Sequence, residues 1–303
     1  MGSRRVLCRA IYGSRKMESG ILVIDKPSGM TSHDVVNRVR LRFKNTKVGH
    51  LGTLDPMATG VLPLCLGKAT RIGQFIDGSP KEYLGEIRLG FSTTTYDREG
   101  EMTSAETNFQ GSVESLREAV SRFTGEFEQT PPPFSAKKIG GVPSYKFARR
   151  GRPIGTPAVP VQVDTFEITR IDLPVLGFRI VCSPGTYVRS LAHDLGQALG
   201  CGAHLASLRR TRSGAFHESH AVSLENASAS SVIPLSELLR KWPQVEISEE
   251  QETRIAHGNP VPGPSGSGQL ACIFNKRGEF LAVGVLENGW VLPRVVLTSI
   301  TSK

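Results

Sequence analysis

The hydrophobic and polar positions of this chain form strand-like and helix-like segments from about residue 20 onward. Apolar runs and period-two alternation predict strands, whereas apolar residues three or four positions apart predict helices. These patterns predict strands at 21–24, 61–66, 83–89, 178–182 and 204–208. They also predict helices that begin at Ser32, Ser112 and Thr186, whose hydroxyl groups can cap a helix.

A separate β-rich segment follows Trp242 and Pro243, where we expect a domain boundary. Ser248 and Gln251 have capping-box spacing and predict a short helix that ends at Gly258. Strands are predicted at 269–274 and 279–286. We therefore expect three parts, which are a flexible extension over 1–18, a main domain over 19–242 and a small β-rich domain over 243–303.

Composition narrows the class of protein. The chain has 303 residues, of which 39% are hydrophobic and 21% charged, as in ordinary globular proteins and unlike disordered or collagen-like chains. No apolar run reaches the roughly 18 residues that a membrane span needs. The five cysteines are widely spaced without a C-x-x-C pair, so we expect neither a disulfide framework nor a metal site. A reducing, cytoplasmic compartment is the simpler interpretation.

The net charge of +9 is concentrated in two acid-free segments. Residues 1–17 carry +5, residues 129–163 carry +6, and the rest of the chain together carries −2. A basic excess is typical of proteins that bind nucleic acid. The 129–163 segment is also long, rich in proline and glycine and poor in apolar pattern, which favours either a functional insertion or disorder.

The segment 49–60, with the sequence GHLGTLDPMATG, has the densest concentration of unusual residues. Its three glycines permit close backbone approach, and Asp55 is its one carboxylate. Pro56 favours an extended conformation for Asp55. Residue chemistry alone favours a turn or capping role for Asp55 over a functional one.

Several motifs together resemble the TruB family of tRNA pseudouridine synthases, over essentially residues 20–300. They are Asp25-Lys26-Pro27, the 49–60 loop, Lys81-Glu82-Tyr83, Pro131 to Lys138, Gly185-Thr186-Tyr187-Val188-Arg189 and Leu208-Arg209-Arg210. The resemblance implies an α/β (α+β) fold with a mixed, mainly antiparallel sheet flanked by helices, and a PUA-like C-terminal domain of the bacterial type. It also implies isomerisation of uridine 55 in the tRNA T-loop to pseudouridine, with no cofactor and no metal.

The resemblance assigns roles to six positions. Asp55 matches the catalytic carboxylate, a group that can act as a covalent nucleophile, and Arg189 matches the arginine that favours its ionised form. Tyr83 matches the tyrosine that stacks on the flipped base. The other matched substrate-binding residues are His50, Tyr187 and Leu208. Attack on ribose C1′, addition to the uracil ring and proton abstraction are all open for the carboxylate.

Residue patterns alone favour structural roles for several of these positions. Tyr83 and Leu208 fit a buried strand, and Arg189 fits the surface of a helix's first turn. A cation in a first turn is mildly unfavourable, which weakly supports a functional reason for Arg189. His50 has no second ligand at metal spacing, so zinc is not expected there.

The basic 129–163 segment lies where the family carries an insertion that closes on the tRNA arm. Lysine and arginine contacts to phosphates supply affinity independent of sequence. The expected RNA-backbone contacts are Lys137, Lys138, Arg149, Arg150 and Arg152. We expect a monomer that acts on tRNA without an obligate protein partner or a membrane. The alternative is a non-catalytic tRNA-binding or RNA-folding protein that keeps the same pocket.

Overall fold

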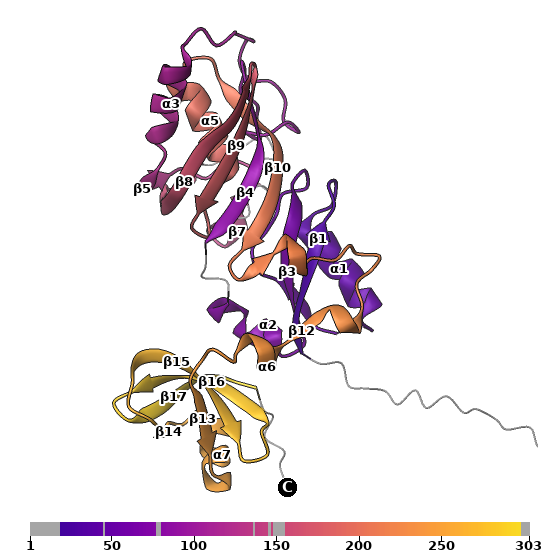
Figure 1. The fold of residues 1–303 in the computed structure, drawn as a ribbon, viewed down its shortest axis with the longest axis vertical. Coiled ribbons are helices and arrows are strands. Elements are labelled where there is room, and N and C mark those ends of the chain that lie inside the picture. Colours follow the sequence, from indigo (N-terminus) through magenta and orange to yellow (C-terminus); the bar gives the residue numbers. More distant parts are fainter. Residues whose placement is uncertain are drawn as a thin grey trace, which may run out of the picture.

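The computed structural model describes residues 19–44, 46–76, 80–135, 137–144, 147 and 155–297. Within these residues, ten strands form one mixed sheet and five form a second, smaller sheet (Figure 1). The expected fold class, a mixed and mainly antiparallel sheet with helices and a β-rich C-terminal part, is confirmed. In this described part of the chain, every helix is too short or too polar to span a bilayer.

The large sheet has the order β12-β1-β3-β10-β4-β9-β8-β5, with β2 beside β3 and β11 beside β10. Its strands are β1 (Gly20–Lys26), β2 (Val48–His50), β3 (Thr59–Leu66), β4 (Lys81–Leu89), β5 (Gly125–Gln129), β8 (Val159–Asp172), β9 (Val175–Cys182), β10 (Ala203–Ser213), β11 (Phe216–His217) and β12 (Val232–Pro234). A short hairpin is formed by β6 (Lys138–Ile139) and β7 (Val142–Pro143). The described helices of this part are α1 (Ser32–Arg42), α2 (Ala69–Ile72), α3 (Val113–Ser121), α5 (Val188–Ala198) and α6 (Leu235–Leu238), with 3-10 turns η1 (Gly73–Phe75), η2 (Glu218–His220) and η3 (Ala229–Ser231).

Strand β1 is buried on both of its faces, which explains its continuous apolar sequence. Leu22 and Ile24 pack in a core that also contains the buried faces of α1, α3 and α5. Ile21 and Val23, which point the other way, pack in a second core with α2 and α6. The two cores therefore enclose the β1–β3 edge of the large sheet between layers of helix.

The second sheet has the order β13-β15-β16-β17-β14. Its strands are β13 (Gln244–Ile247), β14 (Val261–Pro262), β15 (Ser267–Asn275), β16 (Phe280–Glu287) and β17 (Trp290–Val296), and α7 (Glu249–Ala256) packs beside them. The capping box of Ser248 and Gln251 begins α7, as its spacing predicts.

Two expected helix caps are wrong. Thr31, not Ser32, caps α1, in a capping box with Asp34. Tyr187, not Thr186, is the N-cap residue of α5, and its side chain makes no capping hydrogen bond. In both places the predicted hydroxyl has another partner, because Ser32 binds the backbone of Leu54 and Thr186 lies 3.2 Å from the Ser183 hydroxyl.

Candidate functional site

The sheet topology brings the Asp55 loop to the N-terminus of α5. Strand β3 begins directly after the loop and pairs in parallel with β10 at Thr59–Arg209 and Gly60–Arg210. Helix α5 packs on β10. The loop, the middle of the sheet and the first turn of α5 therefore meet, although Asp55 and Arg189 lie 134 residues apart in the chain.

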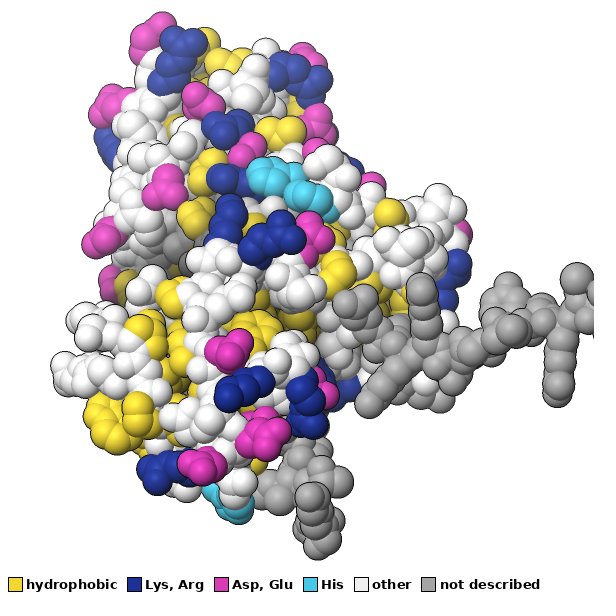
Figure 2. Space-filling view, turned by 60° about the horizontal axis from the view of Figure 1, so that its bottom comes forward, with side chains coloured by type: hydrophobic (Ala, Val, Ile, Leu, Met, Phe, Trp, Pro, Cys, Tyr) yellow, Lys and Arg dark blue, Asp and Glu magenta, His cyan; other side chains and the backbone are white. Residues whose placement is uncertain are grey.

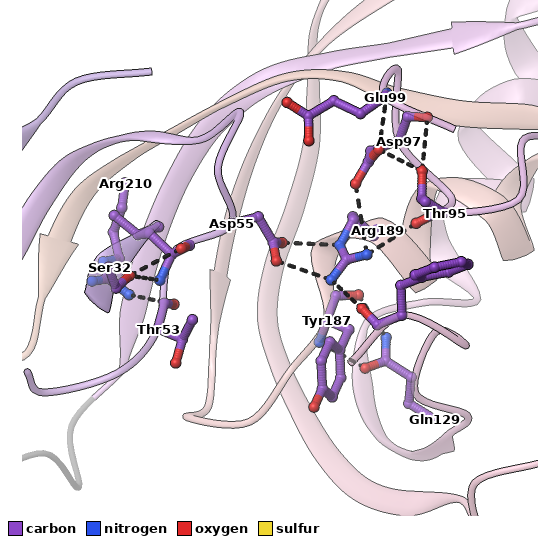
Figure 3. A network of polar contacts seen from close by, with 12 residues as sticks. Ser32, Thr53, Asp55, Thr95, Asp97, Glu99, Gln129, Tyr187, Arg189 and Arg210 are labelled. Atoms are coloured by element: carbon purple, nitrogen blue, oxygen red, sulfur yellow. Dashed lines mark hydrogen bonds and ion pairs between the residues drawn. The ribbon is translucent and has the colours of Figure 1, made fainter. Parts of the chain in front are cut away.

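Asp55 and Arg189 form a bidentate ion pair at the centre of this junction (Figure 3). Arg189 Nε donates to Asp55 Oδ2 and Nη2 donates to Oδ1, both at 2.9 Å. The Arg189 side chain is 6% exposed, whereas that of Asp55 is 32% exposed. A planar guanidinium paired in this way holds a carboxylate in one orientation. Asp55 thus combines a fixed orientation with access from solvent, as a nucleophile or base requires.

Arg189 also binds groups other than Asp55. Its Nη1 donates to the Thr95 carbonyl and its Nη2 to the Phe134 carbonyl, both at 3.0 Å. Asp97 Oδ2 lies 3.6 Å from Nη1 as a second carboxylate, and its side chain is 6% exposed. The buried cation is therefore compensated by two anions and two carbonyl groups, which fixes its position.

Asp97 is a site residue that the sequence analysis missed. Tyr96 precedes it with a φ of +64°, which is uncommon for a residue other than glycine. The Tyr96 ring stacks on His193 of α5 at 3.7 Å between ring centroids. This stack anchors the turn that presents Asp97 to Arg189. An aromatic residue beside a lone aspartate is a weak sequence signal, because it also occurs in ordinary turns.

Two fully buried cations hold the backbone of the Asp55 loop and its flanks. Lys26 Nζ donates to the carbonyls of Pro27, Pro56 and Ala58 at 2.9, 3.1 and 2.6 Å. Burial lowers the pKa of Lys26 from 10.5 to about 8. Arg210 donates on the other side of the loop to the carbonyls of Val61, Thr53 and Gly52. These contacts give the loop a fixed backbone on both sides of Asp55.

Tyr83 and Leu208 lie on the same face of the sheet beside the loop. Tyr83 pairs across the strands with Arg210, and Leu208 pairs with Gly85, two residues further along β4. Both side chains are 7% exposed and belong to the core that contains α5. Burial raises the pKa of Tyr83, although a hydrogen bond with Arg210 partly opposes that rise. The structure brings both residues next to the loop, within a packed core.

Tyr187 and His50 occupy two different sides of the junction. Tyr187 precedes α5, and its backbone N–H and C=O bind the side chain of Gln129. His50 ends β2 and lines a separate cavity of about 210 Å³ with Leu51, Thr70 and Gln74, among others. Tyr187 therefore belongs to the Asp55–Arg189 junction, and His50 faces a neighbouring hollow.

The basic residues of the 129–163 segment are only partly described. Lys137 Nζ donates to the Pro157 carbonyl at 3.2 Å, and the backbone of Lys138 lies in β6. Arg149, Arg150 and Arg152 lie outside the described residues. Among the residues that are described, no group of three or more His, Cys, Asp or Glu side chains could hold a metal ion.

Comparison with protein-family models defines the class of protein. Residues 40–188 match the N-terminal domain of the TruB family pseudouridylate synthases, 189–240 match the C-terminal domain of tRNA pseudouridylate synthase B, and 243–297 match the C-terminal region of pseudouridine synthase II TruB. A solved structure titled "Crystal Structure of a Cbf5-Nop10-Gar1 Complex" has a TM-score of 0.67 and 27% identity to this chain, covering 93% of it and 86% of the other chain. The family match and the fold are those of a pseudouridine synthase, an isomerase.

Curated relatives give a more specific assignment. The tRNA pseudouridine synthase B of Solibacter usitatus is 45% identical over 279 residues, which cover 88% of this chain and 94% of that protein. The enzyme of the same name from Pseudomonas aeruginosa is 40% identical, covering 94% of this chain and 98% of its own length. The chain belongs to the TruB family of tRNA pseudouridine synthases.

Proposed function

We propose that this protein converts uridine 55 in the T-loop of cytoplasmic tRNA to pseudouridine, with Asp55 as the catalytic carboxylate. The observation that carries the proposal is the bidentate Asp55–Arg189 pair, formed by two motifs that match the family. Its carboxylate is fixed, paired with a buried cation and 32% exposed. The names of the relatives supply the substrate class, because both are tRNA pseudouridine synthases.

The isomerisation balances without a cofactor. The bond between ribose C1′ and uracil N1 breaks, a bond between C1′ and C5 forms, C5 loses its hydrogen and N1 gains one. Asp55 is near the reacting centre in this proposal and acts as nucleophile or base. Arg189 keeps its orientation through Asp97 and two carbonyl groups, so that the carboxylate stays aimed at the substrate.

Substrate contacts are assigned to the residues around this pair. Tyr83 stacks on the flipped uracil, while Leu208 and Tyr187 line the same pocket. His50 enters the T-loop from its side of the junction. Contacts to the tRNA backbone come from Lys137, Lys138, Arg149, Arg150 and Arg152. The enzyme acts as a monomer. It also acts without an obligate protein partner, which activity of the purified chain alone would test.

A domain assignment accompanies the function. Residues 19–242 form the pseudouridine synthase domain and 243–303 form a PUA-like domain, whereas the extension expected over 1–18 lies outside the described residues. The runner-up function is a non-catalytic tRNA-binding or RNA-folding protein with the same pocket. That function would not need a carboxylate held as Asp55 is held.

Release of tritium from C5-labelled uridine in a T-arm RNA tests the proposal, since C5 loses its hydrogen when pseudouridine forms. We expect Asp55→Asn to lower the rate of release by at least about 10³-fold, as loss of a nucleophile does, and to leave RNA binding intact. Asp164→Asn, a control at an exposed carboxylate on β8, should release tritium at the wild-type rate. Release by Asp55→Asn at the wild-type rate would overturn the assignment of the carboxylate.

A further inference from the structure

Helix α5, which carries Arg189, lacks a capping side chain of its own. Its N-cap residue Tyr187 makes no side-chain capping bond, and Thr186 before it contacts Ser183 instead. An uncapped first turn leaves backbone donors unsatisfied and is prone to fraying. The first turn of α5 nevertheless holds the guanidinium that orients Asp55, so another group must fix it.

Gln129, the last residue of β5, makes that connection from 58 residues away in the chain. Tyr187 N–H donates to its Oε1 at 2.8 Å, and its Nε2 donates to the Tyr187 carbonyl at 3.1 Å (Figure 3). The side-chain amide thus pairs with the backbone of Tyr187 as a neighbouring strand would. Gln129 is 1% exposed, so solvent cannot replace either hydrogen bond.

The segment after Gln129 makes two more contacts with the same turn of α5. The Ser190 hydroxyl donates to the Thr130 carbonyl at 2.8 Å, and Arg189 Nη2 donates to the Phe134 carbonyl at 3.0 Å. That Arg189 nitrogen also donates to Asp55, so one guanidinium joins the segment and the carboxylate. Of these contacts, those of Gln129 hold backbone atoms at the start of α5, which belong to Tyr187. The other two hold the side chains of Arg189 and Ser190.

We propose that Gln129 is a positioning residue, which holds the Tyr187 backbone and thereby aims the Arg189 guanidinium at Asp55. This inference rests on the proposed pseudouridine synthase function. Gln129 does not touch the substrate in this proposal, so its loss should slow the chemical step and leave RNA binding unchanged. A displacement of about 1 Å in a catalytic group can cost about 10²-fold in rate, which sets the scale of the effect.

The first test compares kcat with KM for tritium release from the T-arm RNA. Gln129→Met nearly keeps the side-chain volume but removes both hydrogen bonds. We expect kcat to fall by about 10- to 100-fold with KM unchanged, because orientation is lost and binding is not. Gln197→Met is the control for the same substitution, since Gln197 is exposed on the same helix and its side chain binds only the Ser92 hydroxyl among the contacts described. It should keep the wild-type kcat.

A second variant separates positioning from packing. In Gln129→Glu the ionised carboxylate can accept from Tyr187 N–H but repels the Tyr187 carbonyl, whereas the protonated form restores a donor. The ratio of variant to wild-type kcat should therefore rise as the pH falls from 8 to 5.5. Taking this ratio cancels the titration of groups common to both proteins. Gln129→Met should show a ratio that does not change with pH.

Loss of kcat in Gln129→Met together with recovery of Gln129→Glu at low pH would support the proposal. A wild-type kcat in Gln129→Met, or a flat pH ratio in Gln129→Glu, would overturn it while the proposed function stood. An unmodified protein that released no tritium would instead overturn the proposed function. If Gln129→Met fails to fold, the pH ratio of Gln129→Glu alone decides.

Discussion

Lys26 and Arg210 are buried cations whose described hydrogen-bond acceptors are mainly backbone carbonyls. Burying an ammonium group is costly, and the lowered pKa of Lys26 is the measure of that cost. Both residues are 0% exposed beside the Asp55 loop. Burial disfavours the charged form of Lys26, and the hydrogen bonds of both residues hold the loop backbone from two sides.

The pH dependence of stability should reveal the state of Lys26. An unfolded lysine keeps its proton to about pH 10.4, whereas folded Lys26 releases it near pH 8. Between these values the unfolded state binds more protons, so the wild type gains stability as the pH rises. Relative to Lys26→Met, its free energy of unfolding should increase by about 2 kcal/mol in total between pH 8 and 10, with a slope of at most about 1.4 kcal/mol per pH unit.

Denaturant unfolding at several pH values measures this difference. Lys68→Met, at an exposed lysine, is the control for the loss of one positive charge. A difference between wild type and Lys26→Met that stayed constant from pH 8 to 10 would show that Lys26 keeps its proton in the folded state.

At the scale of elements, one hydroxyl group at the start of α1 binds the backbone of the Asp55 loop. Ser32 Oγ donates to the Leu54 carbonyl at 2.9 Å and accepts from Leu54 N–H at 2.8 Å. Thr31, the preceding residue, caps the helix at an exposed position. Two neighbouring hydroxyl groups at the start of α1 thus bind different segments: that of Thr31 caps the helix, and that of Ser32 binds the loop before Asp55.

Alanine substitutions at these two positions should separate the effects of the two contacts. Ser32→Ala leaves buried Leu54 groups without a partner, which costs about 1–3 kcal/mol, and we expect kcat for tritium release to fall because the loop loses an anchor. Thr31→Ala should cost about 1 kcal/mol of stability through the lost cap, with kcat unchanged. Denaturant unfolding and the release assay check the two effects. Equal kcat in both variants would contradict the role assigned to Ser32.

The sequence predicts most helices and strands of the chain. It does not predict which residues bind the side chains at the ends of these elements. Apolar runs such as 21–24 locate strands because burial on both faces leaves a local pattern. Ser32 and Thr186 fit the local rule for caps, yet each has a tertiary partner or a neighbour that the rule does not contain. Asp55 and Arg189 can be singled out through their motifs. Gln129 and Asp97 could not, since their importance lies in contacts between distant segments.

At the scale of the whole molecule, the second sheet shares a core with the first. Cys272 and Val283 of that sheet pack in the same cluster as Ile21 of β1, together with Leu239, which follows α6. The second sheet also has a core of its own around Ile255 of α7. The C-terminal part is therefore attached through buried apolar surface, which favours a fixed position over a swinging one.

Charge is distributed unevenly along this chain. The described residues of the second part, 243–297, carry a net −2, with six acidic and four basic side chains. On the face shown in Figure 2, basic and acidic side chains are interspersed. The net negative charge of 243–297 and the mixed charges on this face do not form a continuous basic surface for RNA. Residues 1–17 and 129–163, with +5 and +6, hold the excess positive charge.

Removing the same amount of positive charge from either segment allows their contributions to RNA binding to be compared. If 129–163 contacts the tRNA backbone, replacing Lys137, Lys138, Arg149, Arg150 and Arg152 with glutamine should weaken binding. It should also flatten the slope of log K against log salt by roughly 0.7–0.9 for every phosphate that the protein no longer neutralises. Deletion of residues 1–17 removes the same +5 and should change neither binding nor turnover. Titrations of a T-arm RNA at several salt concentrations measure both. Equal weakening by the two changes would mean that total charge, and not the location of the insertion, sets the affinity.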